Sequence, residues 1–92
     1  MSISQQQITL SLGTAVRIVG KHNMPHDVIL HNQTKSSNEY IFIGNEQVST
    51  ANGMHIDPGG TIYLTIPPDD ELWAVSDPGG LVVGVTDIRK NG

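Results

Sequence analysis

Short apolar runs separated by polar turn formers fill this chain. In several runs every second residue is apolar, which is the period of a β-strand that lies with one face against a core. Helical spacing is weak throughout, because β-branched residues, ten Gly and five Pro disfavour helices. We expect strands at residues 7–12, 15–19, 26–32, 39–44, 48–50, 54–56, 61–66, 72–75 and 81–88.

The number and spacing of these runs predict the fold class. About eight short strands that recur roughly every 8–12 residues are typical of a sandwich or barrel. We therefore expect an all-β fold, a single small antiparallel β-sandwich or jelly-roll-like barrel. The runs at 26–32 and 39–44 are apolar on both faces, which favours central strands. The expected core is Val16, Ile18, Val28, Leu30, Ile41, Ile43, Ile56, Ile62, Leu64, Ile66, Leu72, Ala74, Val83 and Val85.

Strong turn signals separate the strands in the second half of the chain. Asp57-Pro58-Gly59-Gly60 predicts a turn in which Pro sets φ and the first Gly takes a positive φ, and the same four residues recur at 77–80. Ala51-Asn52-Gly53 predicts a type I′ hairpin turn. Gly84, inside the last run, predicts a bulge or a close approach of another group.

The length of the chain allows one core. Its 92 residues predict one domain, with residues 14–92 as the sandwich and residues 1–13 as an N-terminal arm or an edge strand. There is no Cys, so disulfides and thiolate metal sites are excluded. Since a small core of this kind gains stability from partner subunits, we expect a homo-oligomer.

Charge and hydropathy argue against two classes of partner. The formal net charge is −4 and the five basic residues are scattered, so no basic patch for nucleic acid is expected. No apolar run approaches the roughly 18 residues that cross a membrane, and the start of the chain lacks the pattern of a signal peptide. We therefore expect synthesis in the cytoplasm and no membrane partner.

Histidine and carboxylate groups are present without a catalytic or metal-binding spacing. His22 and His26 flank Asn-Met-Pro in a loop, and His31 and His55 are isolated. No His-x-His occurs, and Pro25 prevents a helix from placing two imidazoles one turn apart. The run Asp69-Asp70-Glu71 is interpreted as a solvated turn rather than a wrapped cation loop. No metal or other cofactor is expected.

Other reactive motifs are absent from the sequence. It has no Gly-x-Ser-x-Gly and no Gly-x-x-x-x-Gly-Lys, so neither a hydrolase elbow nor a phosphate loop is predicted. We expect a protein that is not an enzyme. Trp73 lies between Leu72 and Ala74 in the strand pattern, which favours the outer face of the sheet. There it could pack under a loop, contact a partner protein or stack on a sugar ring.

Six motifs in order resemble a small β-sandwich family of tailed-phage virion proteins. They are VILHN from Val28, YIFIG from Tyr40, VSTANGMHIDPGG from Val48, TIYLTI from Thr61, ELWAVS from Glu71 and GGLVVGV from Gly79. Together they cover about two-thirds of the chain. The extra charges at Asp69-Asp70 and the His22–His26 loop depart from the family pattern.

This resemblance implies a non-enzymatic structural protein of the virion. The leading hypothesis is a capsid decoration protein that binds the major capsid protein on the outer surface of the shell as a homotrimer. It would be part of a virion that is assembled in the host cytoplasm. The resemblance transfers no binding residues. From the sequence we expect the partner contact at Ile3, Ile8, Leu10, His22, His26 and Trp73.

Two alternatives remain open at this point. A tail or fibre module would recognise another virion protein, or carbohydrate through Tyr63 or Trp73. A cupin-like metalloenzyme fits the turn rhythm of residues 56–75, but its His-x-His and Glu ligands are missing.

Overall fold

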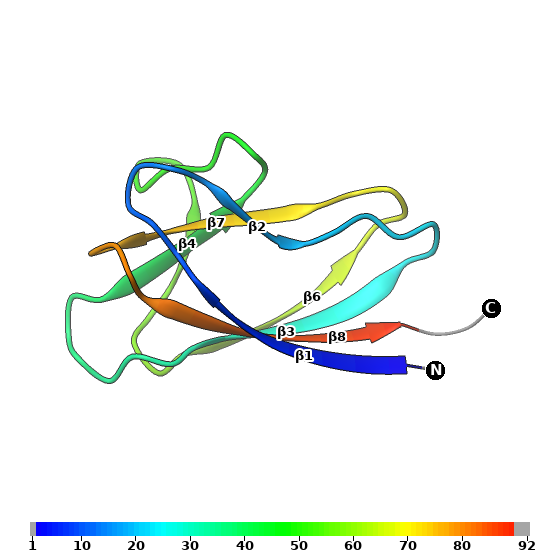
Figure 1. The fold of residues 1–92 in the computed structure, drawn as a ribbon, viewed down its shortest axis with the longest axis horizontal. Helices are drawn as coiled ribbons and strands as arrows, with labels where there is room; N and C mark the ends of the chain where they lie inside the picture. The colour runs from blue at the N-terminus through cyan, green and yellow to red at the C-terminus, as the bar shows by residue number, and fades with distance from the viewer. Residues whose placement is uncertain (1, 90–92) are drawn as a thin grey trace.

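The computed structural model describes residues 2–89, and within them the chain forms eight strands and no helix. The strands are β1 (Ser2–Thr9), β2 (Val16–Val19), β3 (His26–Asn32), β4 (Tyr40–Gly44), β5 (Met54–Ile56), β6 (Thr61–Ile66), β7 (Leu72–Asp77) and β8 (Val82–Arg89). They make two four-stranded antiparallel sheets that lie in two layers (Figure 1). The predicted all-β antiparallel fold is confirmed.

The strand order shows that the chain is rolled up like one long hairpin. The order is β1-β8-β3-β6 in the first sheet, called sheet A below, and β2-β7-β4-β5 in the second, sheet B. The first strand therefore pairs with the last, the second with the seventh, the third with the sixth and the fourth with the fifth. Pairing of β3 with β8 and of β4 with β7 completes each sheet. This is the topology of a jelly roll.

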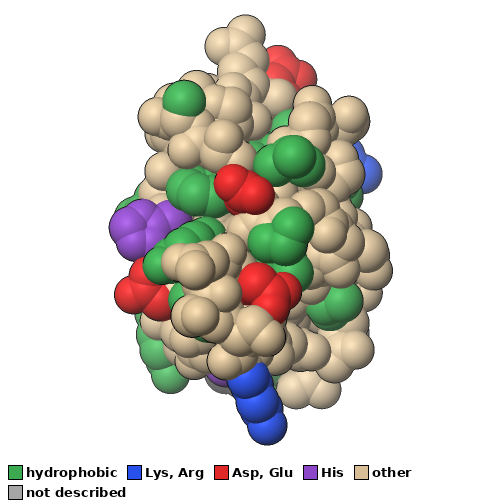
Figure 2. Space-filling view, turned by 90° about the vertical axis from the view of Figure 1, so that its left-hand side faces the viewer, with side chains coloured by type: hydrophobic (Ala, Val, Ile, Leu, Met, Phe, Trp, Pro, Cys, Tyr) green, Lys and Arg blue, Asp and Glu red, His purple; other side chains and the backbone are tan. Residues whose placement is uncertain are grey.

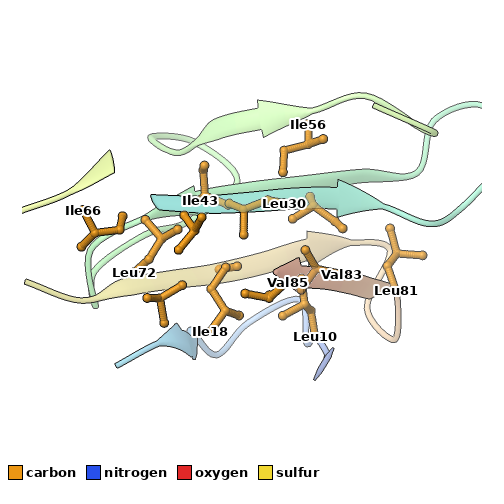
Figure 3. Close-up of a cluster of buried hydrophobic side chains, with 14 residues drawn as sticks. Leu10, Ile18, Leu30, Ile43, Ile56, Ile66, Leu72, Leu81, Val83 and Val85 are labelled. Carbon is orange, nitrogen blue, oxygen red and sulfur yellow. The ribbon is translucent and has the colours of Figure 1, made fainter. Parts of the chain in front are cut away.

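The core lies between the two sheets and contains most of the residues expected there (Figure 3). Its members are Leu10, Ile18, Val19, Val28, Leu30, Ile41, Ile43, Ile56, Ile66, Leu72, Ala74, Leu81, Val83 and Val85. Val16, Ile62 and Leu64 were expected inside, but they are only partly buried and pack against the core from its margins. The flanks of the sandwich are thus less covered than its centre.

The first strand begins earlier than the apolar pattern predicts. Residues 7–12 were expected as a strand, but β1 covers Ser2–Thr9 and pairs with β8 over its whole length, from Ser2 opposite Arg89 to Thr9 opposite Val82. Its backbone pairing does not require apolar side chains. Leu10 and Leu81 extend the ladder past both strand ends through a 2.8 Å hydrogen bond from Leu10 N–H to Leu81 O, and both are buried.

The segment between β4 and β5 is a folded loop. Residues 48–50 were expected to be extended, but Val48 N–H instead donates to Asn45 O at 2.9 Å. The Val48 side chain is buried against Gly53, where an added Cβ would lie 2.7 Å from Val48 Cγ2. Neither Asn52 nor Gly53 has a positive φ, so the expected type I′ turn is wrong. Local hydrogen bonds and the buried Val48 decide this conformation.

The two Asp-Pro-Gly-Gly turns differ in conformation. At 57–60 the prediction is confirmed, because Gly59 has φ of 72° and Gly60 N–H donates to Asp57 O at 2.8 Å. At 77–80 the positive φ falls on Gly80 (88°), and the Asp77–Pro78 bond is cis. The same four residues therefore do not determine one turn geometry; their neighbours do.

Gly84 marks a close approach and not a bulge. The pairing of β8 with β1 is unbroken at Gly84. An added Cβ at this position would lie 2.7 Å from Nε2 of Gln33.

Asn32, at the end of β3, links the two sheets. Its side chain is fully buried, and its Nδ2 donates to Glu39 O and to Ile56 O, both at 3.0 Å. Its Oδ1 accepts the Thr34 N–H at 3.2 Å. Ile56 belongs to sheet B and Asn32 to sheet A, so one amide spans the interior between them.

We expect replacement of Asn32 to weaken the fold strongly. Asn32→Ala leaves the buried Ile56 carbonyl and the part-buried Glu39 carbonyl without this donor, which lowers the free energy of unfolding by about 2–4 kcal/mol. Urea unfolding followed by circular dichroism measures this. The control is the exposed neighbour, since Gln33→Ala should cost less than about 0.5 kcal/mol. Equal losses in the two variants would contradict the bridging role.

Candidate functional site

The outer face of sheet A carries an apolar stripe that crosses all four strands. The register places Ile3 opposite Ile88, and Ile29 opposite Tyr63, with side chains pointing away from the core. Ile3 is 61% exposed and Tyr63 is 74% exposed, whereas Ile29 and Ile88 are half-buried. A shallow groove of about 270 Å³ runs between Ile29, Tyr63 and Ile88. We call Ile3, Ile29, Tyr63 and Ile88 the outer stripe.

The two free edges of sheet A lack the features that usually block edge-to-edge pairing. β1 and β6 are its edge strands, eight and six residues long, and neither contains a charged residue or Pro. Folded proteins commonly protect edges with charges, Pro, bulges or short strands. Sheet B has such protection, because β2 has four residues, Arg17 and a register shift, and β5 has three residues.

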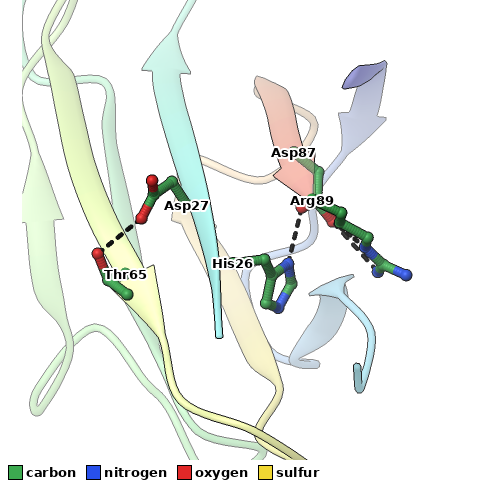
Figure 4. Close-up of polar contacts among 5 residues, drawn as sticks. All are labelled: His26, Asp27, Thr65, Asp87 and Arg89. Carbon is green, nitrogen blue, oxygen red and sulfur yellow. Dashed lines mark hydrogen bonds and ion pairs between the residues drawn. The ribbon is translucent and has the colours of Figure 1, made fainter. Parts of the chain in front are cut away.

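A buried imidazole–carboxylate pair lies on the core-facing side of sheet A. His26 Nδ1 and Asp87 Oδ1 are 2.7 Å apart, and the His26 side chain has no solvent exposure. Asp87 Oδ2 also accepts from Arg89 Nε at 3.2 Å. His26 and its neighbour Asp27 point to opposite faces of β3, and Asp27 accepts the Thr65 hydroxyl (Figure 4). His26 belongs to β3 and Asp87 to β8, so the pair joins these two strands. Because the His26 side chain is enclosed, the pair does not face a substrate.

The loop before β3 is held by backbone contacts. His22 packs the edge of its ring against His26, with centroids 5.5 Å apart, and its carbonyl accepts the Asp69 N–H at 2.7 Å. The two loops at this end of the sandwich therefore support each other. Within residues 2–89, no three His, Asp or Glu side chains are grouped as metal ligands.

The residues expected at the partner contact do not form one surface. Ile3 is exposed, and Ile8 is half-buried and packs against the core. Leu10 and His26 are buried inside this chain's own sandwich, so they are not accessible to a partner in this structure. In this small sandwich the residue that follows β1 and the first residue of β3 both lie in the interior. His22 is half-buried in the loop described above.

The aromatic candidates lie on opposite sheets. Trp73 is half-buried on the outer face of sheet B, opposite Gly44 and Arg17 in the register. Tyr63 lies on the outer face of sheet A. A single sugar can therefore stack on only one of the two rings, and carbohydrate recognition through Tyr63 or Trp73 stays a prediction.

The acidic run 69–71 is dispersed in the turn before β7. Glu71 pairs with Arg17 at 3.0 Å, and Asp70 Oδ1 accepts the Glu71 N–H at 2.9 Å. Their oxygens point to different partners, which fits a solvated turn.

One end of the sandwich shows hydrophobic, acidic and histidine side chains scattered over the surface rather than gathered in one patch (Figure 2). The described residues include no helix that could cross a membrane.

Comparison with known proteins supports the fold. No protein-family model matches the chain, and no curated protein matches its sequence. A solved structure is similar, a chain from Bacillus endospore appendages, described as a novel family of disulfide-linked pili. The similarity has a TM-score of 0.51 and 12% sequence identity, and covers 98% of this chain and 90% of that chain. At this identity it shows a shared fold. The resemblance to phage virion proteins stays a prediction.

Sequence reasoning missed the buried polar pair, and it described the β1 segment only as an N-terminal arm or edge strand. The pairing of His26 with Asp87 spans 61 positions and had no local signal. The free edge of β1 had a signal, because the chain carries no charged residue before Arg17. A polar strand without charges is unusual for an edge exposed to solvent. The candidate functional site is therefore the pair of edges of sheet A, together with the outer stripe.

We expect the buried pair to stabilise the sandwich. Asp87→Ala leaves the Nδ1–H of His26 without an acceptor, so the free energy of unfolding should fall by about 1–3 kcal/mol in urea unfolding. Asp27→Ala is the matched control, since Asp27 bonds Thr65 on the outer face, where water can replace it. If Asp27→Ala cost as much as Asp87→Ala, burial would not be the reason for the effect.

Proposed function

We propose that this chain is a non-enzymatic structural protein that is built into, or binds onto, a repetitive protein assembly. The observation that carries this proposal is the uncharged eight-residue edge of β1, all of whose residues are exposed except the half-buried Ile8. An exposed edge strand offers a row of unpaired N–H and C=O groups to another chain.

The fold comparison supports a role in an assembly. The similar chain comes from Bacillus endospore appendages, which are described as pili. That structure is described as disulfide-linked, whereas this chain has no Cys. An assembly of this chain would therefore be held by non-covalent contacts of its own residues.

The motif resemblance supports a more specific form of the proposal. In this form the chain decorates a phage capsid, as a trimer that binds the major capsid protein on the outer surface of the shell. A stiff sandwich loses little conformational freedom on docking, and many weak copies add through multivalency. The fold comparison favours the other form, a subunit of a filament or appendage.

One experiment separates the two forms. The purified chain is studied by sedimentation and electron microscopy, alone and with undecorated shells assembled from a phage major capsid protein. Filaments of the chain alone support the appendage form, and co-sedimentation with shells without filaments supports decoration. A monomer that neither assembles nor binds shells overturns the proposal.

We expect a charge on the β1 edge to weaken this assembly. Gln5→Lys places an ammonium on the exposed strand and should lower the assembled fraction about tenfold in the same sedimentation assay. Gln47→Lys makes the same change in the exposed β4–β5 loop and serves as the matched control. An equal effect of both substitutions would point to net charge as the cause.

A further inference from the structure

The two free edges of sheet A run in opposite directions. β1 is antiparallel to β8, β8 to β3, and β3 to β6, so β6 is antiparallel to β1. When a second copy stands beside the first in the same orientation, its β6 comes next to β1 as an antiparallel strand. The all-antiparallel pattern of the sheet then continues without interruption from one copy to the next.

Each of these edges carries one large exposed hydrophobic side chain on the same face. Ile3 of β1 and Tyr63 of β6 both belong to the outer face of sheet A. Within one copy, three strand spacings of about 4.8 Å separate the two edges, so the side chains do not cover each other. Between neighbouring copies they become directly opposite or diagonal partners, a range that an aromatic ring reaches.

We propose that β1 of one copy pairs with β6 of a second copy, so that sheet A extends head to tail through the assembly. This inference rests on the proposed structural function and names its partner as a second copy of this chain. Six residues of β6 are available to pair with β1. Ile62 and Leu64, partly buried at the β6 flank, gain cover from the added strand.

The other edge combinations satisfy fewer of these groups. Pairing of β1 with β1 of a second copy closes a symmetric dimer and leaves Tyr63 exposed on both copies. The edges of sheet B are short, and β2 also carries Arg17 and a register shift. A β1–β6 contact is heterologous, because it uses two different surfaces, and it therefore generates a ring or an open filament.

Two substitutions and their mixture test this pairing. Ile3→Lys blocks the β1 edge and leaves β6 intact, whereas Tyr63→Lys blocks β6 and leaves β1 intact. We expect the wild-type chain to assemble, and each variant alone to stay monomeric in analytical ultracentrifugation. An equimolar mixture should form 1:1 heterodimers, because one intact β1 edge meets one intact β6 edge and both other edges are blocked.

The control makes the same change at an exposed hydrophobic residue on an edge strand of sheet B. Met54 is 51% exposed on β5, so Met54→Lys should assemble like the wild-type chain. Circular dichroism establishes that each variant is folded, and Gln7→Lys and Thr65→Lys offer second variants on the same two strands.

Each other outcome overturns the pairing. If Tyr63→Lys alone still forms dimers, β1 pairs with itself. If the mixture stays monomeric while the wild-type chain assembles, another surface joins the copies. A wild-type chain that stays monomeric but binds shells overturns the β1–β6 pairing and leaves the proposed structural function standing.

Discussion

The buried amide of Asn32 is the constraint on which the arrangement of the two sheets depends. Its backbone N–H donates to Gly60 O and its C=O accepts the Gly59 N–H, both at 3.0 Å, while its side chain reaches Glu39 and Ile56 in the other layer. The turn at 57–60 is where the chain passes from sheet B to sheet A. One residue thus fixes the crossing point of the chain and the start of β4. A buried polar group with all its bonds made specifies one arrangement of its surroundings.

A second buried polar contact performs the corresponding task at the other end of β3. His26 and Asp87 join β3 to β8 on the core side, so β3 is held by polar bonds at both ends and by Val28 and Leu30 between them. This makes β3 and β8 the rigid centre of sheet A. The edges β1 and β6 lie on either side of that centre, and their positions are fixed by it. β1 and β6 therefore have a fixed direction and register within sheet A, although their outer edges are exposed.

The sequence was sufficient to predict the fold class and much of the core, because strand periodicity and apolar character are local properties. β3 was located at its observed bounds, since VIL is followed by polar turn formers. β1 was misplaced, because a polar edge strand owes its conformation to hydrogen bonds with β8, which no local pattern encodes. The candidate site was only partly predictable for the same reason. Ile3 was identified, whereas Leu10 and His26 were assigned to a partner contact although they are buried. Tyr63 of β6 was considered only as a residue that could stack on a sugar.

The absence of charge on β1 and β6 has a consequence for how the assembly would respond to its surroundings. Contacts between opposite charges weaken as salt rises, since mobile ions screen them within about 8–10 Å at physiological strength. Contacts made of backbone hydrogen bonds and apolar side chains are not screened in this way, and salt also reduces the repulsion between copies that each carry a net charge of −4. Copies joined through sheet A would therefore remain joined in brine. Such resistance to salt suits a particle or fibre that must persist outside the cell that made it.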